Sequence, residues 1–167
     1  MYERLVRRYP TAQSLASARL PAVERMIGTL GLPERARRLK AMARALSATS
    51  SMPHTDRKTL LALPGVGDYV ADAVEAFVYD REVCTLDANV VRFLGRFYGI
   101  PINGEARRSK HTRVTADRFI HGAPPRELNL AILDHCALTC APRKPKCAQC
   151  VIAKWCQTGK AAVYPES

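Results

Sequence analysis

The chain has 167 residues, which is enough for one domain, or two small lobes, with a buried core. Hydrophobic residues make up 47% and charged residues 25%, which excludes a disordered protein, and no segment approaches the roughly 18 apolar residues of a membrane span. The 26 Lys and Arg residues against 15 Asp and Glu residues give a net charge of +11, which favours a nucleic-acid partner over a merely solvated basic surface.

The first segment, MYERLVRRYP, is too polar for the apolar core of a signal peptide. We therefore expect a cytosolic protein whose thiols stay reduced. The next periodic segment is PERARRLKAMARALS at 33–47, in which apolar side chains recur at helical spacing and most of the arginines fall off that stripe. Pro33 suits the first turn of this predicted helix.

A turn, LPGVG at 63–67, separates two predicted helices. Pro64 presets the approach of the chain, and Gly65 and Gly67, on either side of Val66, let the backbone turn without a Cβ clash. The amides of the two glycines can then point outward at the start of the next helix, where they would bind a nucleic-acid phosphate without reading its base. An ordinary corner between two helices has the same pattern, so the turn alone decides nothing.

Two helices are predicted on either side of a short break. In DYVADAVEAFVYD at 68–80, we expect an apolar stripe formed by Val70, Ala73, Val74, Phe77 and Val78. Asp87 precedes the second helix, ANVVRFLGRFYG at 88–99, which should end at Gly99. Asp87 is placed to cap that helix, or, at the mouth of a cleft, to stabilise a developing cation or orient a water molecule.

Basic side chains gather in the loop GIPINGEARRSKHTR at 99–113, namely Arg107, Arg108, Lys110 and Arg113. They form either a solvated loop or a phosphate-facing patch, and the sequence does not separate the two. A further helix is predicted in RELNLAILDHCALT at 126–139. Because no segment alternates with a period of two over a useful length, we predict an all-α protein.

Four cysteines near the end of the chain have the spacing C-x6-C-x2-C-x5-C: Cys140, Cys147, Cys150 and Cys156. Clustered thiolates in a reducing compartment indicate a metal site, and one graded series of gaps favours a [4Fe–4S] cluster in the loop 140–156. Zinc, whose usual signature has two C-x2-C pairs, and a disulfide pairing are the alternatives. Cys84 and Cys136 fall outside the spacing and are expected to be small buried side chains.

Three cations, Arg143, Lys144 and Lys146, lie in the first gap of the cysteine spacing. A loop fixed by a cluster would hold them in a set arrangement, which suits phosphate contacts because less ordering entropy remains to be lost on binding. This favours a structural and DNA-docking role for the cluster. Electron transfer is the alternative that the sequence leaves open.

Together, LPGVG, Asp87 about twenty residues further on and the cysteine spacing resemble the DNA glycosylases of the helix-hairpin-helix, Gly/Pro-Asp superfamily, over essentially the whole chain. The resemblance implies a two-lobed all-α fold, with a hairpin lobe at 1–81, incomplete at its N-terminus, and a cluster lobe at 82–167. It implies that Gly65, Val66 and Gly67 bind DNA and that hairpin carbonyls hold a monovalent cation. The implied partner is double-stranded DNA with a mismatched or damaged base, bound by a monomer in a prokaryotic cytoplasm, with the nucleoid.

The resemblance also implies roles in base removal, after the base is flipped out of the stack. Asp87 would stabilise the oxocarbenium-like sugar cation or assist the nucleophile, and Asn89 would help to place water. Tyr69 would face Asp87 across the cleft, at the position where lyase members such as endonuclease III carry a Schiff-base lysine. We therefore expect base removal without a lyase step. A partly buried packing role is the alternative for Tyr69.

The sequence resembles two kinds of glycosylase. LDANVVR and CAPRKPKC look closest to archaeal-type thymine glycosylases that act on G·T mismatches, whereas YERLVRRYPTAQSLASARLPAV looks like the adenine glycosylases. The adenine enzymes usually have Gly where this chain has Ala88. We therefore expect removal of thymine or uracil opposite guanine, with removal of adenine opposite guanine or 8-oxoguanine as the alternative.

The family usually has a further N-terminal segment that carries a catalytic Glu and a Gln-containing wedge. Nothing in this sequence matches either, and Glu75 and Glu105 have no positional claim to replace the missing acid. We expect a fragment, a mis-started reading frame or a reduced family member. The rival classes are a non-catalytic DNA-binding iron–sulfur protein and an electron carrier, although the latter leaves the hairpin and the charge unexplained.

Overall fold

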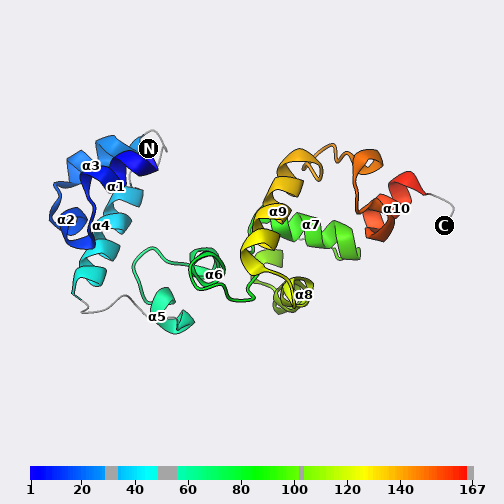
Figure 1. Cartoon of the computed structure of the whole chain (residues 1–167), viewed down its shortest axis with the longest axis horizontal. Helices are drawn as coiled ribbons and strands as arrows, with labels where there is room; N and C mark the ends of the chain where they lie inside the picture. The colour runs from blue at the N-terminus through cyan, green and yellow to red at the C-terminus, as the bar shows by residue number, and fades with distance from the viewer. Residues whose placement is uncertain (29–33, 49–55, 102–103, 165–167) are drawn as a thin grey trace. The chain divides into compact units, whose positions relative to one another are not determined.

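A computed structural model describes residues 1–28, 34–48, 56–101 and 104–164 (Figure 1). Within these ranges all regular secondary structure is helical, which confirms the all-α prediction. The α-helices are Tyr2–Arg8 (α1), Ala12–Ser17 (α2), Leu20–Ile27 (α3), Glu34–Ser47 (α4), Arg57–Leu61 (α5), Asp68–Phe77 (α6), Ala88–Tyr98 (α7), Lys110–Ile120 (α8), Pro125–Leu138 (α9) and Gln157–Val163 (α10). Short 3-10 helices are Ala106–Arg108 (η2), Cys147–Gln149 (η3) and Ala153–Trp155 (η4). No helix in the described ranges is long and apolar enough to cross a bilayer, and Pro33 lies outside those ranges.

The chain divides into two compact units, Met1–Gly67 and Asp68–Ser167. The boundary therefore falls before α6, whereas the sequence placed it at about residue 81. Helix α6 belongs to the second unit because it packs against α9 and because Asp72 on α6 pairs with Arg113 on α8. The LPGVG turn consequently ends the first unit, while Tyr69 and Asp87 both lie in the second.

The first unit has a small core. Val23 and Ile27 of α3 and Ala36 of α4 are buried, and partly buried side chains of α1 and α2 pack around them. The apolar residues predicted for the α4 stripe are buried or half-buried, and the arginines off that stripe are exposed. The helical period read from the sequence of α4 is therefore confirmed.

Lys40 is the main polar tie within the first unit. Its side chain is buried on α4, and Nζ donates hydrogen bonds to the carbonyl oxygens of Ala16, at 2.8 Å, and Ala18. Both carbonyls lie at the C-terminal end of α2, where a helix leaves its last carbonyls without partners. Lys40 therefore anchors α2 to α4.

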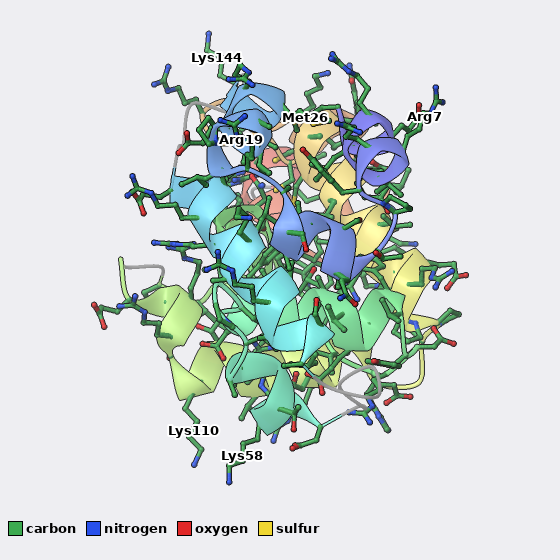
Figure 2. The ribbon with its side chains drawn as sticks, turned by 90° about the vertical axis from the view of Figure 1, so that its left-hand side faces the viewer. Arg7, Arg19, Met26, Lys58, Lys110 and Lys144 are labelled. Atoms are coloured by element: carbon green, nitrogen blue, oxygen red, sulfur yellow. The ribbon has the colours of Figure 1, made fainter. Side chains whose placement is uncertain are left out.

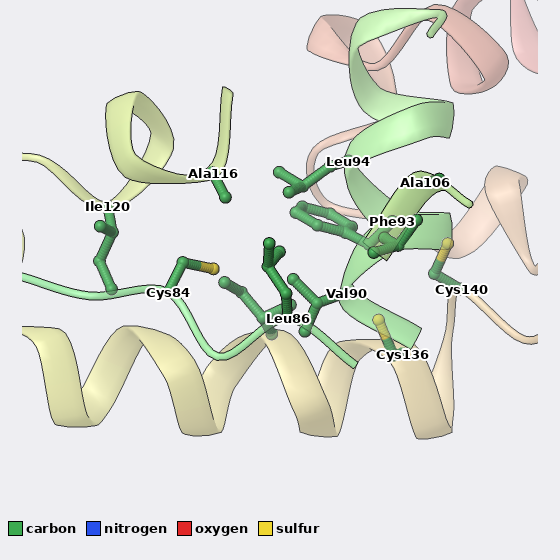
Figure 3. Packing of buried hydrophobic residues seen from close by; sticks show 12 residues of the cluster. Cys84, Leu86, Val90, Phe93, Leu94, Ala106, Ala116, Ile120, Cys136 and Cys140 are labelled. Carbon is green, nitrogen blue, oxygen red and sulfur yellow. The ribbon is translucent and has the colours of Figure 1, made fainter. Parts of the chain in front are cut away.

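The second unit encloses a larger core, formed by α7, α8, α9 and the segment that leads into α7 (Figure 3). Its buried side chains include Val90, Phe93, Leu94, Ala116, Ile120 and Ile132. Cys84 and Cys136 are buried in this core, as predicted. Gly99 has φ of 70° and ends α7 in the left-handed conformation, which confirms the predicted C-terminal cap.

Helix α6 turns a different face inward from the one that its apolar residues predict. Its buried residues are Ala71, Asp72, Glu75 and Ala76. Val70 and Val78, which belong to the predicted stripe, are 40% and 61% exposed. The predicted stripe is therefore buried only in part, because Ala73, Val74 and Phe77 are half-buried while its two end residues face solvent.

The physical reason is that the two buried acids of α6 each have an arginine partner. Asp72 Oδ2 lies 2.6 Å from Arg113 Nη2, and Glu75 Oε1 lies 3.2 Å from Arg81 Nη1. A buried carboxylate is tolerated when it is paired and hydrogen-bonded. These two pairs allow the acidic face of α6 to be buried, whereas Val70 and Val78 stay exposed.

Candidate functional site

The LPGVG turn forms directly after α5. The Val66 N–H donates to the Leu63 carbonyl at 3.1 Å, and Gly65, between them, has φ of 84°. With Pro64 in second place and a left-handed glycine in third, this is a type II turn. The left-handed backbone conformation favours glycine here, and a Cβ on Gly65 would also lie in tight contact with Cβ of Arg38, at 3.2 Å.

Gly67 contributes differently from Gly65. Its φ is not positive, and a Cβ at this position would meet nothing within 4 Å, so the turn itself does not require this glycine. Among the described residues, no hydrogen bond uses the N–H of Gly65 or of Gly67, whereas the N–H of Val66 is committed to the turn. Two of the three amides predicted to bind DNA are therefore available to an anion.

Asp87 caps α7 through its side chain, as the sequence predicts. Its Oδ1 accepts from the backbone N–H groups of Asn89 and Val90, each at 2.8 Å. Its Oδ2 accepts from the side-chain amide of Asn89 at 2.9 Å. Asp87 is half-buried, and both of its carboxylate oxygens are thereby held in fixed positions.

A chain of hydrogen bonds continues from Asp87 to the cysteine loop. The side-chain oxygen of Asn89 accepts from Arg92 Nη1 at 2.9 Å. Arg92 in turn donates to the carbonyl oxygen of Cys140 from Nε at 3.2 Å and from Nη2 at 3.0 Å. No motif in the sequence marks Arg92, and the only available signal is its helical i+3 spacing from Asn89.

Arg96, one turn further along α7, holds the same loop directly. Its Nη1 lies 3.4 Å from Cys140 Sγ and donates to the Ala141 carbonyl at 2.8 Å, while Nη2 donates to the Pro142 carbonyl at 2.7 Å. The Cys156 thiol donates to the Arg96 carbonyl at 3.3 Å. A guanidinium presents five donors in one plane, so a single side chain fixes several loop atoms at once.

The four predicted cysteine ligands line one hollow, whose empty volume is about 360 Å³ including its opening to solvent. The backbone N–H of Gly159 lies 3.4 Å from Cys156 Sγ, and His135 Nε2 lies 3.8 Å from Cys150 Sγ. In the part of the chain that the structure describes, no three His, Cys, Asp or Glu side chains are arranged to hold a metal ion. The cysteines thus surround a shared space without closing on a single point.

Burial governs the titration of the thiols and of the nearby imidazole. It raises the pKa of Cys147, with a smaller contribution from the neighbouring cysteines, and it lowers the pKa of His135, whose ring is therefore neutral at neutral pH. Away from the hollow, burial raises the pKa of Cys84 to about 12 and that of Cys136 to about 11. Both of these thiols stay protonated and behave as small core side chains.

The remaining predicted residues are exposed. Tyr69, in the first turn of α6, is 45% exposed, so its ring is not part of the core. The cations of the cysteine loop are exposed, and Figure 2 shows Lys144 extending away from the ribbon. Arg113 differs from the other cations of its loop because it turns into the second unit and pairs with Asp72.

The fold and these features define a helical protein in which a helix–hairpin–helix turn, an aspartate-capped helix and a four-cysteine loop share one chain. Residues 1–116 match the model of the family described as HhH-GPD superfamily base excision DNA repair protein. The chain belongs to this superfamily, as the resemblance predicted.

Similar proteins include DNA glycosylases of two specificities. The chain is 30% identical over 158 residues to the thymine/uracil-DNA glycosylase of Methanothermobacter thermautotrophicus, covering 93% of this chain and 72% of the relative. It is 34% identical over 165 residues to the thymine-DNA glycosylase of Aeropyrum pernix, with the same two coverages. It is 32% identical over 159 residues to the adenine DNA glycosylase of Mus musculus, of which it spans only 31%.

Solved structures support the same fold. A thermostable thymine-DNA glycosylase superimposes with a TM-score of 0.84 at 30% identity, over 95% of this chain and 74% of that one. A non-covalent complex of endonuclease III with DNA superimposes with a TM-score of 0.82, over 96% and 75% of the two chains. The second likeness, at 22% identity, concerns the fold alone.

Proposed function

We propose that the protein is a monofunctional DNA glycosylase that hydrolyses the N-glycosidic bond of thymine or uracil mispaired with guanine. The observation that carries this proposal is the half-buried Asp87 carboxylate. It is held by the backbone N–H groups of Asn89 and Val90 and by the side-chain amide of Asn89. It stands in a chain that is 30% identical to a thymine/uracil-DNA glycosylase over 93% of its length.

Base removal begins when the mispaired base is extruded from the stack. As the bond from C1′ to the base breaks, the bonding pair leaves with the base and positive charge develops on the sugar. The fixed carboxylate of Asp87 stabilises that charge without having to reorganise. Water adds to C1′ and releases a proton, and the departing base takes up a proton. Asn89, bonded to Asp87 Oδ2, is placed to orient the water.

Tyr69 supports the absence of a lyase step. A phenol has no amine with which to form a Schiff base to C1′, so water is the nucleophile. The abasic strand would therefore remain intact until alkali cleaves it. With 45% of its surface exposed, the Tyr69 ring can contact DNA.

DNA would be held mainly through its backbone in this proposal. The N–H groups of Gly65 and Gly67, which bond to no other described residue, suit a phosphate oxygen, and the exposed cations of the cysteine loop suit others: Arg143, Lys144 and Lys146. A monovalent cation at the hairpin carbonyls, a monomeric state, the facing of Tyr69 and Asp87 across a cleft, and a prokaryotic cytoplasmic location stay predictions.

We also propose that the hollow lined by Cys140, Cys147, Cys150 and Cys156 holds a [4Fe–4S] cluster. Four thiols around one space, with a guanidinium at Cys140 Sγ and a backbone N–H at Cys156 Sγ, fit the thiolate ligands and sulfur hydrogen bonds of such a cluster. When bound, the cluster would fix the loop and its cations. Zinc and an electron-transfer role are the alternatives.

Base release from labelled duplexes containing G·T, G·U, G·A or 8-oxoG·A, assayed with and without alkali, tests the function. We expect release from G·T and G·U, with strand breaks only after alkali. Asp87→Asn, which keeps a good cap, should slow release by about 10²- to 10⁴-fold and leave duplex affinity unchanged. Asp56→Asn is the matched control, because Asp56 caps α5 in the same manner.

Each outcome of that assay has a distinct meaning. Release of adenine in place of pyrimidines would make the protein an adenine glycosylase. Full activity in Asp87→Asn would reduce Asp87 to a structural cap. Salt-dependent duplex binding without release from any substrate would indicate a non-catalytic DNA-binding member of the superfamily.

A further inference from the structure

The segment that leads into Asp87 is clamped by a buried asparagine of α9. Asn129 is fully buried, and its side-chain oxygen accepts from the Thr85 N–H at 2.9 Å and from the Thr85 hydroxyl at 3.0 Å. Its amide donates to the carbonyls of Val83, at 2.9 Å, and Pro125, at 2.7 Å. The backbone two to four residues before Asp87 is thereby fixed to α9.

A second clamp reaches the same segment from α8. Arg113 Nη1 donates to the Cys84 carbonyl at 3.0 Å, and its Nη2 lies 2.6 Å from Oδ2 of the fully buried Asp72. Asp72 lies on α6, one helical turn after Tyr69. One guanidinium therefore ties the helix that carries Tyr69 to the segment that ends in Asp87.

Stability alone is a weak reason for this arrangement. Burying two charges costs roughly as much as their attraction returns, and apolar side chains of similar volume often replace such a pair without loss. A rigid guanidinium can donate to two acceptors at once in a fixed geometry, which an apolar pair cannot do. The Arg113–Asp72 pair therefore serves mainly to fix the position of α6 relative to the segment before Asp87.

We propose that Arg113 is a positioning residue, which uses Asp72 and the Cys84 carbonyl to fix the Tyr69 helix against the Asp87 segment. The expected effect of Arg113 on the rate of base release rests on the proposed glycosylase function. The proposal also separates Arg113 from the basic loop residues that face solvent, since both ends of its guanidinium have partners inside the second unit.

Arg113→Lys tests the proposal. Lysine keeps the charge beside Asp72 but lacks the planar fork that serves two acceptors. Because a misplacement of about 1 Å can cost 10²-fold in rate, we expect the single-turnover rate of base release to fall about 10- to 100-fold. Duplex affinity and its salt dependence should stay unchanged, because the Arg113 guanidinium is committed to Asp72 and the Cys84 carbonyl.

Arg81→Lys is the matched control, since Arg81 pairs with Glu75, the other buried acid of the same helix. It should leave the single-turnover rate within twofold of the wild type. Hydrogen exchange of the Asn89 and Val90 amides, which Asp87 holds, adds a readout that needs no activity. We expect their protection to fall about tenfold in Arg113→Lys and not in Arg81→Lys.

An unchanged rate in Arg113→Lys would overturn the proposal, as would a loss confined to duplex affinity with a smaller salt slope, which would indicate a phosphate contact. If the wild type released no base, the glycosylase proposal would fail, and amide protection in the two variants would still decide whether Arg113 holds the segment. If Arg113→Lys did not fold, the double variant Asp72→Asn/Arg113→Met would replace it, because it leaves no unpaired buried charge. It should show the same fall in rate.

Discussion

The two units of the chain are held by hydrogen bonds of different range. In the first unit most side-chain bonds of the described residues join positions two to four apart, as at Thr11 and Ser14, and Lys40 is the exception. In the second unit side chains reach far along the sequence, over 29 residues from Arg113 to Cys84 and over 44 from Asn129 to Thr85. The proposed catalytic residues lie in the second unit, which the long-range hydrogen bonds hold together.

This difference shows where each unit is vulnerable. A local cap can be replaced by water or by a neighbouring side chain at the surface, so its loss costs little. A buried side chain that satisfies several distant backbone groups leaves all of them unpaired when it is removed. We therefore expect single substitutions in the second unit to have larger and more localised consequences for the site.

Asn129→Ala should have the largest effect. It leaves the Val83 carbonyl and the Thr85 N–H without their buried partner, at about 1–3 kcal/mol each, so the second unit should lose roughly 3–5 kcal/mol. Lys40→Met removes the corresponding long-range hydrogen bonds from the first unit. It should lower the stability of that unit by about 1–2 kcal/mol, because the apolar methionine side chain can still pack where the lysine stem does. Native-state hydrogen exchange measures the two units separately. Equal losses in the two variants would contradict the comparison.

Gly159→Ala should have the next largest effect, on the cysteine loop. An added Cβ would lie 2.6 Å from the Ala153 carbonyl oxygen and 2.8 Å from Ala153 Cα, so the backbone of Ala153, whose carbonyl accepts from the Cys156 N–H, must move, at a cost of about 1–3 kcal/mol. We expect anaerobically purified wild type to contain four irons per chain and the variant fewer. Iron and sulfide analysis, with the visible absorption, measures this.

Gly67→Ala, in the first unit, is the matched control. A Cβ there would meet nothing within 4 Å, so stability and iron content should match the wild type. Full iron in Gly159→Ala would contradict the packing argument for this loop. One zinc per wild-type chain, in place of iron, would contradict the proposed cluster.

The local features of the site could be read from the sequence because each is decided within a few residues. Pro64 and Gly65 specify their own turn, Asp87 caps a helix that starts at the next residue, and Gly99 ends that helix. The graded cysteine spacing likewise placed four thiols around one hollow. Turn and cap chemistry depends on φ and on neighbouring N–H groups, and both are encoded locally.

The sequence could not reveal the long-range part of the site. The apolar stripe of α6 gave no sign that Asp72 is buried, because the burial of this acid depends on Arg113, 41 residues away. Arg92 and Asn129 carry no motif, and their long-range partners lie 44 to 48 residues distant. Such pairings are decided by how the helices pack, which helical periodicity does not specify.

Each unit has an exposed carboxylate whose pKa is lowered in the folded protein, so the stability of each unit should depend on pH. In the second unit, the hydrogen bond with His121 and then that from the Gly122 N–H lower the pKa of Glu82 below its usual 4.5. In the first unit, the Lys58 N–H is the largest cause that lowers the pKa of Asp56 below 3.8. Both carboxylates are exposed, so these effects should be the smallest of those predicted.

The sign follows from the lowered pKa in the folded protein. Each carboxylate binds fewer protons when folded, so its contribution is fully present above the unfolded pKa and is lost as pH falls through the folded one. The urea midpoint of Glu82→Gln should therefore lie below that of the wild type at neutral pH and converge with it at a pH below the folded-state pKa of Glu82. The urea midpoint of Asp56→Asn should lie closer to that of the wild type at every pH, because asparagine still caps α5. Glutamine at position 82, in contrast, weakens the hydrogen bond with His121, 39 residues away. A gap for Glu82→Gln that stayed constant down to that pH would show that its cause is packing rather than charge.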